Sequence, residues 1–139
     1  MDVELLEIHH ATDSRGTLVD FLKRDQLPIP LREFGQMYYV TFDHMGSIRG
    51  KHYHHDKVEW FAVVVGKVFV KLLDLNTGET AEYHLEGNMQ KVMRLRVGTD
   101  IVHTFICESD SATMINYASE PYHDASDTIR HDAENSGSP

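Results

Sequence analysis

The apolar residues of this 139-residue chain occur in short runs of about four to eight, each closed by glycine, asparagine, aspartate or proline. Runs of this length are typical of β-strands separated by turns and are too short for most helices. The predicted strands cover residues 5–9, 17–23, 36–42, 47–54, 58–65, 67–74, 80–85, 91–96, 101–108 and 112–117. A single open sheet could not bury both faces of a run such as 61–65, so the pattern predicts a two-sheet sandwich or barrel.

Several turns between these strands can be placed from their residue types. Gly66 separates two valine-rich runs and predicts a tight hairpin, and residues 76–78 supply the next turn. Pro28 and Pro30 mark a surface loop, with a short helical turn expected at residues 31–34.

Length and composition indicate one soluble domain. A chain of this size buries roughly two-thirds of its unfolded surface, and no internal repeat is present, so residues 1–134 are expected to form one domain and 135–139 a flexible tail. The formal net charge of −9 argues against a nucleic-acid or membrane partner. Cys107 is the only cysteine, which is consistent with the cytoplasm, and neither a signal peptide nor a membrane-spanning run is evident.

Histidines and one glutamate in the middle of the chain have the spacing of a metal site. Residues 46–66 hold, in order, Gly46, His52, His54, Glu59 and Gly66. Two histidines at i and i+2 on a strand project from one face, and Glu59 can return to face them on the next strand. With His103 from a late strand, they would form a mixed nitrogen and oxygen site suited to Zn, Fe, Mn, Ni or Co.

This spacing resembles the first conserved motif of the cupin barrels. In the second motif of that family, which supplies the third histidine, Gly98 and Asp100 stand where Pro and Gly are usual, and Cys107 stands for the usual Asn. Asp tolerates the left-handed conformation, so Asp100 is expected to replace the glycine. A metal-free alternative stays open, in which His52, His54 and His103 line a polar interior; the adjacent His55 is expected on the opposite, solvated face.

The order of motifs along the chain resembles the dTDP-4-dehydrorhamnose 3,5-epimerase superfamily. The segments that carry this resemblance are residues 13–18, 34–40, 46–54, 102–105 and 116–122. The chain is similar also to the sugar 3,4-ketoisomerases and, over residues 49–59, to the cupin domain attached to certain capsule-sugar reductases. The resemblance implies an all-β cupin fold, a double-stranded β-helix or jelly-roll barrel. It further implies an epimerase or ketoisomerase of a dTDP- or UDP-linked 4-keto-6-deoxyhexose in the making of a surface glycan or glycosylated metabolite.

The resemblance also assigns roles to single residues. His52 matches the catalytic base and Tyr122 the tyrosine that returns or relays a proton. Arg15 and Arg49 match positions that hold the nucleotide diphosphate, and Lys51 within the same motif is assigned to substrate binding. Moving a stereocentre or carbonyl next to a ketone requires a base and an electrophile that stabilises the enolate. Aromatic residues, Tyr38 among them, are expected mainly in packing.

Glu59 departs from the epimerases, which have a lysine at the matching position. A carboxylate would repel an enolate unless a cation intervened. A divalent metal held by His52, His54, Glu59 and His103 would supply that charge. In that case Tyr122, His123 or water would act as the base; Asp124, Asp127 and Asp132 are candidates to orient a catalytic histidine.

Other classes of function stay open. One is a metal-dependent cupin enzyme acting on another small molecule, such as a dioxygenase or a simple-sugar isomerase, and another is a non-catalytic ligand-binding cupin. Exposed strand edges are a liability in a monomer, so a homodimer is expected.

Overall fold

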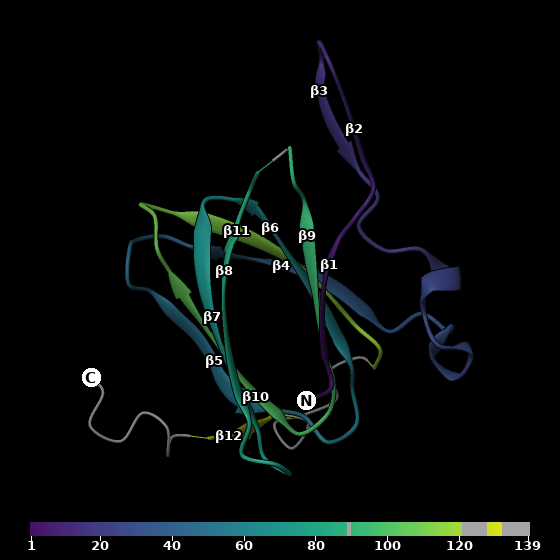
Figure 1. Cartoon of the computed structure of the whole chain (residues 1–139), viewed down its shortest axis with the longest axis vertical. Helices are drawn as coiled ribbons and strands as arrows, with labels where there is room; N and C mark the ends of the chain where they lie inside the picture. The colour runs from purple at the N-terminus through teal and green to yellow at the C-terminus, as the bar shows by residue number, and fades with distance from the viewer. Residues whose placement is uncertain (89, 121–127, 132–139) are drawn as a thin grey trace.

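The computed structural model describes residues 1–88, 90–120 and 128–131, which form two antiparallel sheets and a separate hairpin (Figure 1). The first five-stranded sheet has the order β1 (Val3–Glu7), β9 (Met93–Val97), β6 (Glu59–Val65), β11 (Ala112–Ala118) and β4 (Gln36–Phe42). The second has the order β12 (Ile129–Arg130), β5 (Ile48–Tyr53), β10 (Ile101–Cys107), β7 (Lys67–Asp74) and β8 (Thr80–Glu86). The all-β cupin class is confirmed.

The core lies between the facing surfaces of the two sheets. Strand β7 alternates buried and partly exposed residues, and its Val68 and Val70 are fully buried. Phe61 of β6 and Phe105 of β10 meet across the interior with ring centroids 4.8 Å apart. This alternation is what a sheet with one buried face requires.

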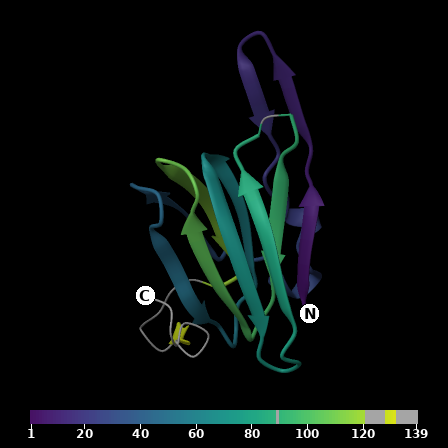
Figure 2. The same ribbon diagram turned by 60° about the vertical axis from the view of Figure 1, so that its left-hand side comes forward.

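A hairpin of β2 (His10–Asp13) and β3 (Gly16–Val19) extends away from the sheets, as two views show (Figures 1 and 2). The run predicted as one strand at residues 17–23 therefore ends at Val19 and pairs with β2. The reason is that its partner is the local segment 10–13 rather than a strand of the barrel.

The segment after the hairpin contains two short 3₁₀ helices, η1 (Arg24–Gln26) and η2 (Ile29–Leu31). The helical turn predicted at residues 31–34 was wrong, because the turn begins earlier, with Pro30 in its first positions. Proline favours the start of a helix, where its fixed φ fits and its missing N–H is not needed. No helix of the described residues is long and apolar enough to cross a membrane.

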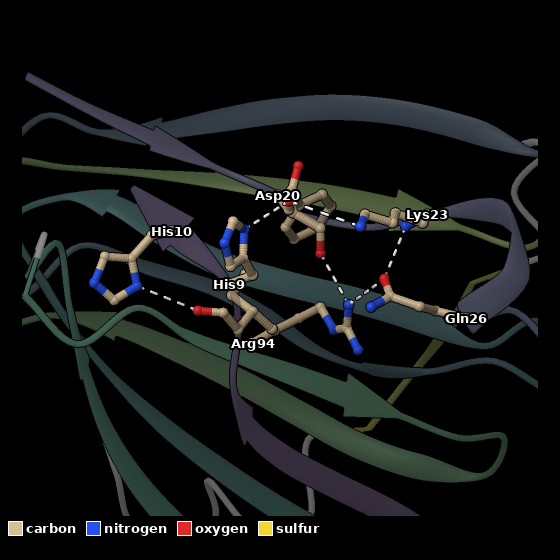
Figure 3. A network of polar contacts seen from close by, with 8 residues as sticks. His9, His10, Asp20, Lys23, Gln26 and Arg94 are labelled. Atoms are coloured by element: carbon tan, nitrogen blue, oxygen red, sulfur yellow. Dashed lines mark hydrogen bonds and ion pairs between the residues drawn. The ribbon is translucent and has the colours of Figure 1, made fainter. Parts of the chain in front are cut away.

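A buried arginine holds this segment against the first sheet (Figure 3). Arg94 of β9 is 6% exposed, and its Nη1 donates to the Phe21 carbonyl at 2.9 Å and to Gln26 Oε1 at 3.1 Å. At the base of the hairpin, His9 Nδ1 lies 2.8 Å from Asp20 Oδ2. Hydrogen bonds thus fix the root of the hairpin, while its tip makes none of these contacts.

The other predicted strands are present, although the first, predicted at residues 5–9, is observed as β1 at Val3–Glu7. The strands at residues 36–42 and 67–74 have the predicted bounds. Gly66 forms the hairpin turn with φ of 81°, and Asp100 adopts the left-handed conformation with φ of 60°. His55 is exposed, as predicted for the residue next to His54.

We predict that Arg94→Met lowers the free energy of unfolding by about 1–3 kcal/mol, because it leaves the Phe21 carbonyl without its donor. Arg96→Met is the matched control. Arg96 pairs with Asp2 at 2.8 Å where both side chains are partly solvated, so its loss should cost less than about 1 kcal/mol. Urea denaturation of both variants measures the difference, and equal losses would contradict an anchoring role for Arg94.

Candidate active site

A β-bulge in β5 aims the side chains of the site. The pairing of β10 with β5 joins His103 to His52 and Thr104 to Gly50, so Lys51 is an extra residue without a partner in this register. Gly50 has φ of 90° and Lys51 of 61°. On a regular strand, residues three apart face opposite sides, yet Arg49 and His52 line the same cavity.

Gly50 is required here for two physical reasons. Its positive φ is disfavoured for residues with a side chain, and a Cβ at this position would overlap the carbonyl of His103. The backbones of β5 and β10 can therefore approach closely only with glycine. This approach brings the His52 and His103 rings within 4.7 Å, centroid to centroid.

The four predicted ligands converge in the interior. The nitrogen atoms that His52, His54 and His103 offer lie within 4.8 Å of one another. Glu59 Oε1 lies 2.9 Å from His54 Nε2 and 3.4 Å from His103 Nε2. His54, Glu59 and His103 are 7%, 3% and 2% exposed, so the cluster is largely shielded from water.

The pKa shifts of three residues describe the charge of the cluster. Burial, with repulsion from His103 and His54, lowers the pKa of His52 to about 3, and burial also lowers the pKa of His103. Both imidazoles are therefore neutral near pH 7. Burial alone would raise the pKa of Glu59, but the contact with His54 and the other imidazoles outweigh it and lower that pKa below its usual range.

The carboxylate oxygen Oε1 of Glu59 is buried without a well-aligned hydrogen bond from a described residue, despite its short distance to His54. The Nδ1 of His103 lies 3.0 Å from the Ile101 carbonyl and donates to it, so the neutral ring presents a lone pair at Nε2 toward Glu59. Two acceptors facing each other at 3.4 Å are stabilised by a cation between them. The donor set fits a divalent metal of the Zn, Fe, Mn, Ni or Co type.

Two cavities meet at the cluster and share Tyr38, His52 and Glu59 as a common wall. The polar chamber, of about 250 Å³, is lined in addition by Gln36, His54, Lys57, Ala118 and Thr128. The apolar chamber, of about 200 Å³, has carbon-rich walls from Val40, Phe61, Phe105 and Met114 and polar groups from Arg49, His103 and Asn116. A ligand in either chamber would touch His52 and Glu59.

The sequence did not predict Lys57 or Asn116 as site residues, and it assigned Tyr38 mainly to packing. Lys57 is 5% exposed and lines the polar chamber. Tyr38 lines both chambers, and burial and the nearby Glu59 charge raise its pKa, so it stays protonated. Asn116 is 1% exposed and donates from Nδ2 to Glu59 Oε2 at 3.2 Å. The spacing along the chain could have indicated two of these residues. Lys57 is two residues before Glu59, and Tyr38 is two before Val40, so an extended backbone would place each pair on one face.

Of the residues that the family resemblance assigned to substrate binding, one lines a chamber and two do not. Arg49 lines the apolar chamber, whereas Lys51 lies on the bulge and is not among the described residues that line either chamber. Arg15 lies in the turn between β2 and β3, with its side chain 88% exposed and paired to Asp13. It is not among the described residues that line either chamber, and its hairpin extends away from the sheets (Figure 1). Tyr122 lies outside the described residues, as do His123, Asp124, Asp127, Asp132 and the tail 135–139.

Comparison with known families assigns the chain to one of them. A model of the polysaccharide biosynthesis C-terminal domain matches residues 11–129. The chain belongs to this family. A UDP-2-acetamido-2,6-β-L-arabino-hexul-4-ose reductase of Pseudomonas aeruginosa is 31% identical over 104 residues, which is 75% of this chain and 26% of the reductase. The chain thus spans about a quarter of the length of that relative.

Solved structures share the same fold. A 3,4-ketoisomerase from Helicobacter canadensis is 21% identical with a TM-score of 0.78, over 96% of this chain and 94% of that one. A dTDP-4-dehydrorhamnose 3,5-epimerase from Bacillus anthracis is 21% identical with a TM-score of 0.77, over 91% and 77% of the two chains. A 3,4-ketoisomerase from Thermoanaerobacterium thermosaccharolyticum bound to TDP-4-keto-6-deoxyglucose is 21% identical with a TM-score of 0.77, over 94% and 88%. The cupin architecture expected from the motifs is confirmed.

We predict that Gly50→Ala is much more destabilising than Gly78→Ala, although both residues have positive φ. A Cβ at Gly78 meets nothing within 4 Å, so that variant should cost only the conformational term of about 1–2 kcal/mol. At Gly50 the overlap with His103 adds to it and should bring the loss to about 3 kcal/mol or more. Chemical denaturation measures both; similar losses would show that the close approach of β5 and β10 is not required.

Proposed function

We propose that this protein is an epimerase or ketoisomerase of nucleotide-linked 4-keto-6-deoxyhexoses, acting on a dTDP- or UDP-sugar through an enolate. The observation that carries the proposal is the convergence of His52, His54, His103 and Glu59 at the wall between two chambers. Support comes from a structural neighbour bound to TDP-4-keto-6-deoxyglucose and from a relative named for a UDP-linked hexulose.

Enolate formation needs positive charge beside the ketone, and the interior has a carboxylate instead. A divalent metal held by His52, His54, Glu59 and His103 is one proposed source, and when bound it would polarise the ketone oxygen as a Lewis acid. The low pKa of His52 supports a role as ligand, because a histidine with a pKa of about 3 is a weak general base at pH 7.

Lys57 is the second proposed source of positive charge. Its side chain is buried at the polar chamber beside His52, His54 and Glu59. An ammonium group there would stabilise an enolate oxygen in a water-poor cavity, where charge interactions are strong. If Lys57 supplies this charge, His52 is free to act as the base, with Tyr122 as the assigned proton relay.

Arg49 is proposed to hold the diphosphate. Its Nε and Nη2 donate to the Thr41 carbonyl at 3.1 and 3.0 Å, and its guanidinium lies 5.6 Å from the centre of the Phe42 ring. These contacts fix a planar cation at the apolar chamber, where it can meet two phosphate oxygens. Lys51 stays a proposed substrate contact from the bulge.

Arg15 supports a homodimer if it contacts the nucleotide as the family resemblance implies. Its hairpin extends away from the barrel of its own chain, so the contact would be made to a second copy (Figure 2). Strand β4 at the edge of the first sheet exposes Met37 and Tyr39 by 52% and 71%. An apolar, unpaired edge of this kind favours pairing with another chain.

The second candidate function is a metal-dependent cupin enzyme on another small molecule, such as a dioxygenase or a simple-sugar isomerase. The histidine cluster and the buried Glu59 carboxylate beside it favour it over a non-catalytic ligand-binding cupin.

We predict that the wild-type protein exchanges solvent deuterium into the carbon next to the ketone of a dTDP- or UDP-4-keto-6-deoxyhexose. His52→Ala should slow this exchange at least about 100-fold, because it removes a base or a ligand of the reacting site. His44→Ala, which removes an exposed imidazole that contacts Asp43, is the control and should exchange normally. Mass spectrometry follows the label; absence of exchange with every keto-sugar tested rejects the proposal.

We predict about one divalent metal ion per chain in protein purified without chelators, and its loss in His103→Ala and in Glu59→Gln. His84→Ala, which removes an exposed histidine on β8, should keep the metal. Elemental analysis measures the amount of metal bound per chain. A metal-free wild type that still exchanges deuterium, and loses exchange in Lys57→Met, would assign the positive charge to Lys57 and refute the metal.

A further inference from the structure

We propose that the polar chamber is a binding site for a carboxylate group, and that Lys57 supplies the positive charge that holds it. The carboxylate is carried by the sugar of a nucleotide-linked substrate or belongs to a free short carboxylic acid. The inference rests on the proposed function only in the first case, where it adds acidic sugars to the substrates. A Lys57 engaged in this way leaves the ketone to the metal, the other proposed source of positive charge.

Lys57 is a buried cation without a partner among the described residues. It is 5% exposed and lines the polar chamber. No hydrogen bond or ion pair joins its ammonium group to a described residue. A buried charge that has lost its water is unfavourable unless an opposite charge or hydrogen bonds replace that water. A negatively charged ligand in the chamber would therefore be stabilised by Lys57 and would stabilise it in turn.

The ammonium nitrogen is open to the chamber. Among the described residues, the side-chain nitrogen and oxygen atoms that are both closed to solvent and without a hydrogen bond are Glu59 Oε1 and Asn116 Oδ1. Lys57 Nζ is not one of them although it has no partner, so part of its surface is accessible. A ligand in the chamber can reach this atom directly.

The charges around the chamber favour a ligand with a single negative charge. Lys57 is the one lysine or arginine among the described residues that line it, and Glu59 lines it as well. Lys57 can compensate one negative charge, so the second charge of a phosphate dianion would lie uncompensated beside the Glu59 carboxylate. A carboxylate leaves no such excess.

The neutral groups of the chamber favour an anion with more than one acceptor atom. Gln36 and Thr128 line the chamber, and both an amide NH₂ and a hydroxyl can donate hydrogen bonds. One oxygen of a carboxylate can pair with Lys57 while the other accepts from such groups. Chloride has no second acceptor atom, so this lining favours a carboxylate over it.

The first arm of the test is isothermal titration calorimetry with glucuronate and glucose, each as the UDP and as the dTDP conjugate. The two sugars differ at C6, where glucuronate has a carboxylate and glucose a hydroxymethyl group. If the sugar carries the carboxylate, the wild type should bind the glucuronate conjugate at least about tenfold more tightly than the glucose conjugate. Lys57→Met should abolish this preference and keep the affinity for the glucose conjugate.

The second arm tests a free acid by thermal denaturation without nucleotide, in sodium acetate and in sodium chloride of equal ionic strength. A ligand that binds only the native state raises the melting temperature. If the ligand is a free acid, saturating acetate should raise the melting temperature of the wild type by about 3 °C or more above its value in chloride. Lys57→Met should show no such difference.

Two further variants control both arms. Lys67→Met removes an exposed lysine that pairs with Glu86 at 3.9 Å, and it should behave as the wild type does. Lys57→Gln removes the charge but keeps a polar side chain. It should show the same losses as Lys57→Met, and it replaces that variant if the methionine protein does not fold.

The outcomes separate this proposal from the proposed function. An effect that depends on Lys57 in either arm supports the carboxylate site and identifies the source of the carboxylate. The site is overturned if neither arm shows an effect, if the effects survive in both Lys57 variants, or if inorganic phosphate stabilises through Lys57 where acetate does not. Binding of UDP or dTDP would then leave the proposed function standing. Failure to bind any conjugate, UDP or dTDP overturns the proposed function, and the acetate arm still decides on the site.

Discussion

A carboxylate in the interior of a barrel governs the rest of this site. Glu59 is 3% exposed, and its negative charge has to be stabilised by whatever surrounds it, because water cannot do so. One oxygen lies near the Nε2 atoms of His54 and His103, and the other accepts from Asn116. The same charge contributes to the raised pKa of Tyr38. A single residue thus orients Asn116 and helps to keep Tyr38 protonated.

The backbone that holds these side chains depends on a local irregularity. The bulge at Gly50 and Lys51 shifts the register of β5 against β10 and lets Arg49 and His52 share a cavity. A regular strand would place Arg49 and His52 on opposite faces. Both bulge positions have positive φ, which is unfavourable for Lys51. The close pairing of β5 with β10 holds the backbone in this conformation.

Much of the fold and of the site could be predicted from the sequence, because both rest on local patterns. The strands follow from short apolar runs, and His52, His54 and Glu59 from alternation across one turn. Strand β2 of the hairpin was missed because its four residues, 10–13, contain no apolar run. Asn116 was missed because its importance arises only when β11 lies beside β6 and places it against Glu59, a contact 57 residues apart in sequence.

Under the proposed function, the two chambers on either side of Tyr38, His52 and Glu59 would contribute differently to recognition and to chemistry. A sugar that reaches His52 from the apolar chamber meets carbon surfaces, Arg49 and Asn116, whereas the polar chamber on the other side presents Lys57 and His54. Binding energy gained in the first chamber can hold the reacting carbon against His52. The charge that stabilises the enolate can then act from the cluster or from the second chamber. Because Glu59 lines both chambers, replacing it would change recognition and chemistry together, whereas Lys57 lines only the polar chamber.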